Sequence, residues 1–262
     1  MVNSGQYCNI LLKTGMPLSQ LRKENTLVCE ELATVQGIPM QRLRKRETST
    51  LRSHRQLGYF IDELMGPKAR RNSSLEEAQI DGRFGEHWDR GQKMVLACLF
   101  RDYRQAAGHG EASRGISGVP YFSVELSFFL LFDALSCLGL YQDGGGGKKL
   151  VRIARRHYRV IKRLSQPSRD FCLSKSYLLR GELSSLSGRR NFDKTMEHYE
   201  CAIALASKAS FVMEEAVACE NAGRFLMKCG RHGGRRYFER AHDLLVKWEA
   251  WAKADQLAPL LR

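Results

Sequence analysis

The sequence predicts an all-α fold, in which an antiparallel array of helices forms a tetratricopeptide-like α-α superhelix. Three observations carry this prediction. Apolar residues recur three and four positions apart along most of the chain, which is typical of amphipathic helices, and no alternating strand pattern competes. The 262 residues include only six prolines, which favours helices over loop-rich designs. Finally, Tyr199 precedes Ala202 by three positions, and the pattern returns 39 residues later at Phe238 and Ala241, as in a stacked helical repeat.

The first 74 residues are predicted to hold two helices followed by a basic linker. Pro17 is typical of the first turn of a helix, so a helix is predicted over residues 17–36. A second helix is expected over residues 40–64. The pattern then breaks at residues 66–74, a stretch of small, polar and basic residues. We therefore place a domain boundary after residue 74, and residues 75–88 show no clear pattern.

Residues 75–262 are predicted to form one tetratricopeptide-like helical-repeat domain. A helical stripe of apolar residues begins at Gln92. The four glycines within residues 108–118 indicate a loop. A strongly apolar helix is expected over residues 120–139, and the glycine run in residues 143–147 predicts a flexible connector.

Six further helical segments are expected after the connector. Each carries apolar or small residues at helical spacing on one side. They cover residues 150–164, 172–186, 192–206, 211–228, 234–248 and 251–261.

Aromatic and small residues are the expected contact points between these helices. An aromatic side chain on one helix packs well where a neighbouring helix offers only alanine. The residues predicted to make this repeat packing are Tyr199, Ala202, Ala206, Ala218, Phe225, Phe238, Ala241 and Trp248.

Four segments, residues 178–188, 198–206, 214–225 and 237–248, resemble one family in their order and motifs. They are similar to the tetratricopeptide-like helical region that follows the AAA-type ATPase domain in large multidomain signalling kinases. Those proteins combine a serine/threonine-kinase-like domain, the ATPase, a GAF domain and often a hybrid histidine kinase. The resemblance covers about residues 92–262.

The resemblance implies a scaffold or regulatory region inside a signal-transduction kinase. Its partners would be other proteins or neighbouring kinase and ATPase domains. This chain carries no kinase motif, no nucleotide-binding loop and no histidine-kinase box, so the catalytic activities of the resembled proteins are not carried over.

Composition and charge narrow the class of protein further. The formal net charge is +14, which favours contact with nucleic acid, an anionic membrane surface or acidic proteins. The eight cysteines are scattered singly, which is typical of reduced core residues in an intracellular, cytoplasmic protein. The start of the chain lacks a signal-peptide pattern. The apolar run over residues 122–140 contains Glu125 and Asp133, so we expect a buried helix and no membrane span.

One segment, residues 148–163, combines eight basic residues with no acidic one. Such a helix can contact the phosphates of nucleic acid or another anionic partner, although a solvated face packed on its apolar side explains the same pattern. The residues predicted to contact an anionic partner are Arg152, Arg155, Arg156, Arg159, Lys162 and Arg163.

Other candidate sites fit their motifs poorly. Residues 144–149 resemble a phosphate loop, but the first glycine and the final hydroxyl residue of that motif are missing. The pairs His198 with Cys201, and Cys229 with His232, could supply zinc ligands, but they lie on separate helical elements. We therefore expect no metal, no cofactor and no catalytic residue.

The sequence thus predicts a non-catalytic helical-repeat scaffold or regulatory interaction module of a signal-transduction kinase system. The alternative is a basic helical nucleic-acid-binding protein that uses residues 148–163 together with residues 42–55.

Overall fold

Helices supply the regular structure of this chain, whose computed structural model describes residues 15–35, 49–67, 83–115, 123–165 and 169–261. No strand occurs among these residues, so the all-α prediction is confirmed. The elements in chain order are α2 (Leu18–Val35), α3 (Ser49–Met65), α5 (Arg83–Leu99), α6 (Tyr103–Arg114), α7 (Ser123–Gln142), α8 (Lys148–Leu164), α9 (Arg169–Ser185), η2 (Gly188–Asn191), α10 (Phe192–Lys208), α11 (Val212–Lys228), α12 (Gly234–Lys247), α13 (Trp251–Leu257) and η3 (Ala258–Leu261).

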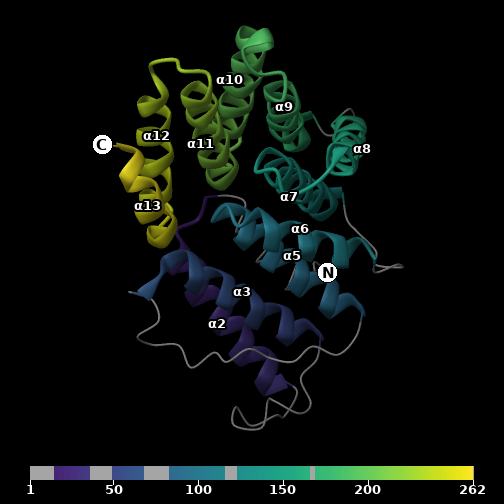
Figure 1. Cartoon of the computed structure of the whole chain (residues 1–262). Coiled ribbons are helices and arrows are strands. Elements are labelled where there is room, and N and C mark those ends of the chain that lie inside the picture. Colours follow the sequence, from purple (N-terminus) through teal and green to yellow (C-terminus); the bar gives the residue numbers. More distant parts are fainter. Residues whose placement is uncertain (1–14, 36–48, 68–82, 116–122, 166–168, 262) are drawn as a thin grey trace.

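Consecutive helices pack as hairpins, as Figure 1 shows. The pairs are α5 with α6, α7 with α8, α9 with α10, and α11 with α12. The first helix of each hairpin also contacts the first helix of the next one, so that α5, α7, α9 and α11 form a continuous row. The second helices of the hairpins flank this row.

The same packing arrangement occurs in two successive hairpins: an aromatic ring of the second helix lies on a glycine of the first helix. The ring of Tyr199 on α10 lies against Gly181 on α9, where an added Cβ would come within 3.0 Å of it. The ring of Phe238 on α12 lies against Gly223 on α11, where an added Cβ would come within 2.8 Å. A larger residue at either glycine would push the helices apart. The aromatic–alanine pattern of the sequence therefore marks equivalent places in two neighbouring hairpins.

The residues predicted to pack between helices are all buried, with at most 3% of each side chain exposed. Six of them, all except Ala206 and Phe238, belong to one continuous apolar cluster that reaches from Leu18 on α2 to Leu257 on α13. None of the described helices combines the length and the apolarity that a membrane crossing requires. The apolar helix α7 lies within the core instead, with residues 129–138 buried.

The C-terminal end of the described chain packs against its N-terminal helices. Helix α13 contacts α3, and α3 also packs on α2 and α5. The backbone N–H of Leu18 donates to the carbonyl of Trp248 at 3.1 Å. The N–H of Ser19 donates to the Glu249 carboxylate at 2.6 Å, so that this acid caps the N-terminus of α2.

The predicted glycine-rich loop over residues 108–118 is wrong for the residues that the structure describes. Helix α6 runs through Gly108 and Gly110 to Arg114. The helical stripe that begins at Gln92 is not one helix either, because α5 ends at Leu99 and α6 begins at Tyr103. Between them, the Asp102 carboxylate accepts a hydrogen bond from the N–H of Gln105 at 3.0 Å, which is a helix N-cap.

The remaining predicted elements agree with the structure where it describes them. Helix α5 covers the later part of residues 75–88, which the sequence left without an assignment. The connector at residues 143–147 lies between α7 and α8. Residues 40–48 of the second predicted helix and residues 68–74 of the linker lie outside the described residues. The boundary at residue 74 therefore stays a prediction.

Candidate functional site

Helix α8 presents its basic residues to solvent and its apolar residues to the core. The buried side consists of Val151, Ala154, His157 and Ile161. The six residues predicted to contact an anionic partner are all exposed. Helical periodicity separates the two sides, because the apolar residues recur three and four positions apart while cations fill the positions between them. Figure 1 places α8 at the outer edge of the array.

No acidic side chain of the described residues pairs with any of these six cations. The closest case on α8 is Lys149, whose ammonium lies 3.7 Å from the carboxylate of Glu111. Both of those side chains are more than 70% exposed, and such pairs contribute little to stability. The exposed side of α8 therefore carries a surplus of positive charge that no described part of this chain neutralises.

A buried carboxylate anchors α8 to the helices beneath it. Asp133 on α7 is fully buried, and its Oδ2 atom lies 2.6 Å from Nε2 of His157 on α8. Its Oδ1 atom accepts from the guanidinium of Arg114 at the end of α6. One carboxylate thus joins three helices, and a pair of this kind fixes orientation because breaking it leaves a buried charge.

The aromatic residues of α8 do not lie on its exposed side. His157 is buried against Asp133, and the half-buried Tyr158 packs against the core. Stacking on nucleic-acid bases needs exposed aromatic faces. The basic side of α8 is therefore suited to charge contacts with an anionic surface and not to stacking on bases.

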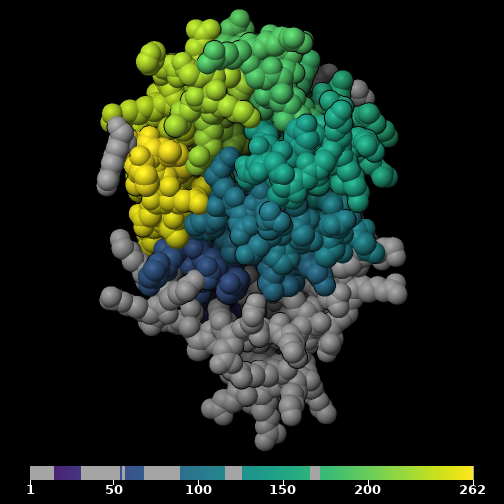
Figure 2. Space-filling view, viewed as in Figure 1, coloured from purple at the N-terminus to yellow at the C-terminus, as the bar shows by residue number. Residues whose placement is uncertain are grey.

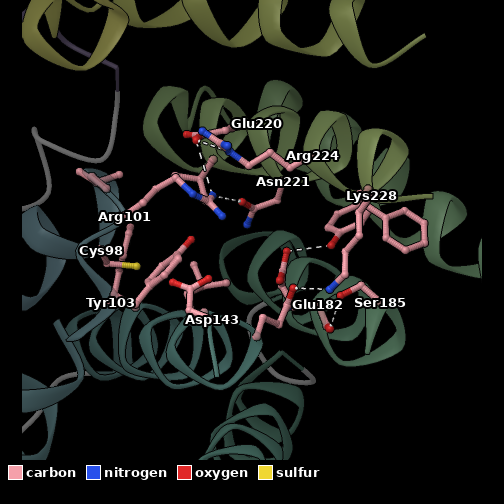
Figure 3. A pocket seen from close by; sticks show the side chains of 18 of the residues that line it. Cys98, Arg101, Tyr103, Asp143, Glu182, Ser185, Glu220, Asn221, Arg224 and Lys228 are labelled. Atoms are coloured by element: carbon pink, nitrogen blue, oxygen red, sulfur yellow. Dashed lines mark hydrogen bonds and ion pairs between the residues drawn. The ribbon is translucent and has the colours of Figure 1, made fainter. Parts of the chain in front are cut away.

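A second feature is a cavity of about 300 Å³ beside the row of first helices. Its wall comes from the α5–α6 turn, α7, α9, α10 and α11. Figure 3 shows Arg101, Asn221 and Glu220 at one end and Glu182, Ser185 and Lys228 at the other. Apolar side chains complete the wall, among them Leu99, Leu135, Val217 and Phe225.

Glu220 is the centre of a charged cluster at one end of this cavity. Its Oε1 atom lies 2.8 Å from Nε of Arg224 and 3.5 Å from Nη1 of Arg101, and its Oε2 atom lies 2.8 Å from Nζ of Lys253. Burial alone would raise the pKa of Glu220, but Lys253, Arg101 and Arg224 outweigh it and lower that pKa. Burial lowers the pKa of Lys253, although Glu220 opposes the shift.

Glu182 is in a different electrostatic environment at the other end. It accepts a hydrogen bond from the Tyr199 hydroxyl at 2.8 Å. Burial raises the pKa of this carboxyl, and the hydrogen bond and the charge of Arg101 reduce that rise. Asn221 links the two ends, because its amide oxygen accepts from Arg101 at 3.3 Å and its side chain also hydrogen-bonds Glu182.

Two further titratable groups of the wall, Tyr103 and Cys98, keep their protons at neutral pH. Burial raises the pKa of Tyr103 far above its usual range. Burial also raises the pKa of Cys98 to about 12. A thiol that stays protonated is a poor nucleophile, so Cys98 is a packing residue of the wall and not a reactive group.

Sequence reasoning missed Arg101, Glu182, Glu220 and Arg224 as members of one cavity. They come from the α5–α6 turn, α9 and α11, and no short motif joins these three segments. One signal was available: Glu220 interrupts the alanine-rich inner side of its helix, where an acidic residue is out of place unless it is paired.

The candidate zinc residues do not form a cluster in the structure. His198 is buried on α10, and Cys201 is half-buried one turn further along. No group of three or more metal-ligating side chains gathers among the described residues. The glycine run at residues 144–147 forms the exposed connector before α8.

No protein-family model, curated protein or solved structure matches the chain. The resemblance to the helical region of signalling kinases therefore stays a prediction.

Proposed function

We propose that this chain is a non-catalytic helical interaction module that binds an acidic protein surface through α8, as part of a signal-transduction kinase system. The observation that carries the proposal is the exposed basic side of α8, whose six cations have no acidic partner among the described side chains. A rigid helix that is anchored from below and charged on its outer side attracts and orients an acidic partner.

The packing of the array supports the same class of function. The helices form hairpins whose first members contact one another in a row, and Tyr199 and Phe238 occupy equivalent places on glycines of successive hairpins. A tetratricopeptide-like superhelix is built in this way, and such arrays bind partners through extended surfaces. We include this repeat architecture in the proposal.

The test measures binding of a labelled acidic polypeptide, such as polyglutamate, by fluorescence anisotropy. Replacing Arg155, Arg156 and Arg159 with Ala should weaken binding at least about tenfold, because three charge contacts are lost. The control variant replaces three other exposed cations, Arg189, Arg190 and Lys194, and removes the same net charge elsewhere. Equal loss of binding in both variants would show that overall charge, and not α8, is responsible.

Nucleic acid is the second candidate partner, favoured by the absence of any acid in residues 148–163. It is the weaker candidate because no aromatic face is exposed on α8. The same assay with duplex DNA and single-stranded RNA decides between the two. Binding that falls steeply with salt and exceeds the affinity for polyglutamate would replace the protein partner with nucleic acid.

The kinase context rests on the resemblance of residues 92–262 and has its own test. Coding sequence for ATPase or kinase motifs directly beside that of this chain would support it. Neighbouring sequence without such motifs would count against the kinase context. The binding of an acidic partner by α8 does not depend on this result and is tested by the anisotropy assay.

A further inference from the structure

The charged cluster around Glu220 holds more positive than negative charge. Lys253, Arg101 and Arg224 all contact this one carboxylate. Lys253 is 2% exposed, and the two arginines are at most 31% exposed. Partly buried cations without a matching number of anions cost free energy. A bound anion at the cavity end of the cluster would offset this cost.

Arg101 reaches the cavity from a backbone conformation that favours glycine. Its φ is 65°, and its N–H and that of Asp102 donate to the carbonyls of Cys98 and Ala97, which is a Schellman helix end. The left-handed position of the same motif is held by Gly144 after α7. A residue other than glycine costs about 1 kcal/mol there. Residues in such conformations cluster at functional sites, which makes the Arg101 side chain a candidate for ligand binding.

Tyr103 adds a neutral donor to the same end of the cavity. The residue as a whole is 8% exposed, and its ring lies under the guanidinium of Arg101, 5.0 Å from the Cζ atom. Its hydroxyl has no hydrogen-bond partner among the described residues. A hydroxyl that lines a cavity and has no acceptor within the protein is available to donate to a ligand oxygen.

The size and the apolar wall of the cavity limit the ligand to a small organic molecule. A volume of about 300 Å³ lies at the lower end of small-molecule sites. The side chains of Leu135, Val217 and Phe225 would contact an apolar group, while the arginines would contact oxygen atoms. A free inorganic ion would leave the apolar part of the wall unused.

We propose that this cavity binds a small organic oxyanion, a carboxylate or a phosphate monoester with a compact apolar group, whose charge is held by Arg101 and Arg224 and whose oxygen accepts from Tyr103. The guanidinium forks match the geometry of both headgroups. This inference is independent of the proposed function, because the basic side of α8 does not line the cavity.

Isothermal titration calorimetry at constant ionic strength tests the proposal with three probes of similar shape. Benzoate and phenyl phosphate carry the two headgroups, and benzyl alcohol is the neutral control. We expect saturable binding of at least one anion and none of the alcohol. The anion that binds more tightly identifies the headgroup. A Kd weaker than about 10 mM for both anions overturns the proposal.

Arg101→Gly is the decisive variant because glycine suits the backbone at this position. It should keep or raise the melting temperature while lowering the affinity for the anion about tenfold or more. Ser210→Gly is the matched control, since Ser210 has a φ of 59° at an equivalent helix end outside the cavity. It should bind like the wild type.

A second variant, Arg224→Gln, keeps a helix-forming residue and should lose affinity to a similar degree. Wild-type affinity in Arg101→Gly or in Arg224→Gln would overturn the proposal. The variant that replaces Arg155, Arg156 and Arg159 should bind the probes normally. Loss of probe binding in that variant would mean that the anions bind α8, which would also overturn the cavity site.

Discussion

The carboxylate of Asp133 lies 2.6 Å from Nε2 of His157 and is fully buried. Among the described helices, Asp133 lies in the most apolar one, α7, and His157 lies in the most basic one, α8. Their contact, together with that of Asp133 and Arg114, links the core to the surface that we assign to partner binding.

Asp133→Asn is expected to lower the free energy of unfolding by about 3 kcal/mol, because one partner of a buried ion pair is removed. Urea denaturation followed by circular dichroism measures the change. Glu239→Gln is the control, since the Glu239–Arg235 pair is exposed and should change stability by less than about 0.5 kcal/mol. Equal effects in the two variants would mean that the Asp133 pair contributes no more than a surface pair.

Alanine should have opposite effects at two glycines of α6. At Gly108 an added Cβ meets nothing within 4 Å, whereas at Gly110 it would collide with Oδ1 of Asp133. Gly108→Ala is expected to stabilise the protein by about 1 kcal/mol through helix propensity. Gly110→Ala is expected to destabilise it by about 1–3 kcal/mol through overpacking. Thermal unfolding shows whether each alanine raises or lowers the melting temperature. Stabilisation by both alanines would contradict the close approach of Asp133 to Gly110.

Two helix ends offer a second pair of opposite changes. Ser210 and Gly230 both occupy the left-handed position of a Schellman motif, with φ of 59° and 66°. Ser210→Gly is expected to stabilise the protein by about 0.5–1 kcal/mol, and Gly230→Ala to destabilise it by about 1 kcal/mol. Denaturant unfolding measures both. A destabilising Ser210→Gly would mean that the serine side chain contributes more than its backbone conformation costs.

The helices could be predicted from the sequence because their signals are local. The two sides of α8 follow from residues three and four positions apart, and the array follows from repeating this pattern. The loop predicted over residues 108–118 failed for a tertiary reason. Glycine there indicated a break, but Gly110 gives Asp133 room to approach α6, and no local pattern reports such a contact.

The cavity could not be predicted because its charged residues meet only in the folded chain. Arg101 and Glu220 lie far apart in sequence, and although Glu220 is out of place on the inner side of its helix, nothing local names Arg101 as its partner. Only the positions of α5, α9 and α11 bring their charges together. The same holds for Glu182, whose environment depends on Tyr199 from the next helix and on Arg101 from the α5–α6 turn.

Glu182→Gln should change how stability depends on pH. Burial raises the pKa of Glu182 in the folded state above its usual value of 4.5. The folded protein therefore holds this proton more tightly than the unfolded chain does. The contribution of Glu182 to stability is fully present below about pH 4.5 and is lost as the pH rises through the folded-state pKa.

Glutamine keeps an oxygen that accepts from Tyr199 but does not ionise. The stability of the variant relative to the wild type should therefore increase as the pH rises from 4.5 to neutrality. Urea unfolding of both proteins across this range measures the difference, in which all other titrating groups cancel. A difference that stays constant, or that shifts toward the wild type with rising pH, would mean that hydrogen bonds and Arg101 outweigh burial and that Glu182 is ionised in the fold.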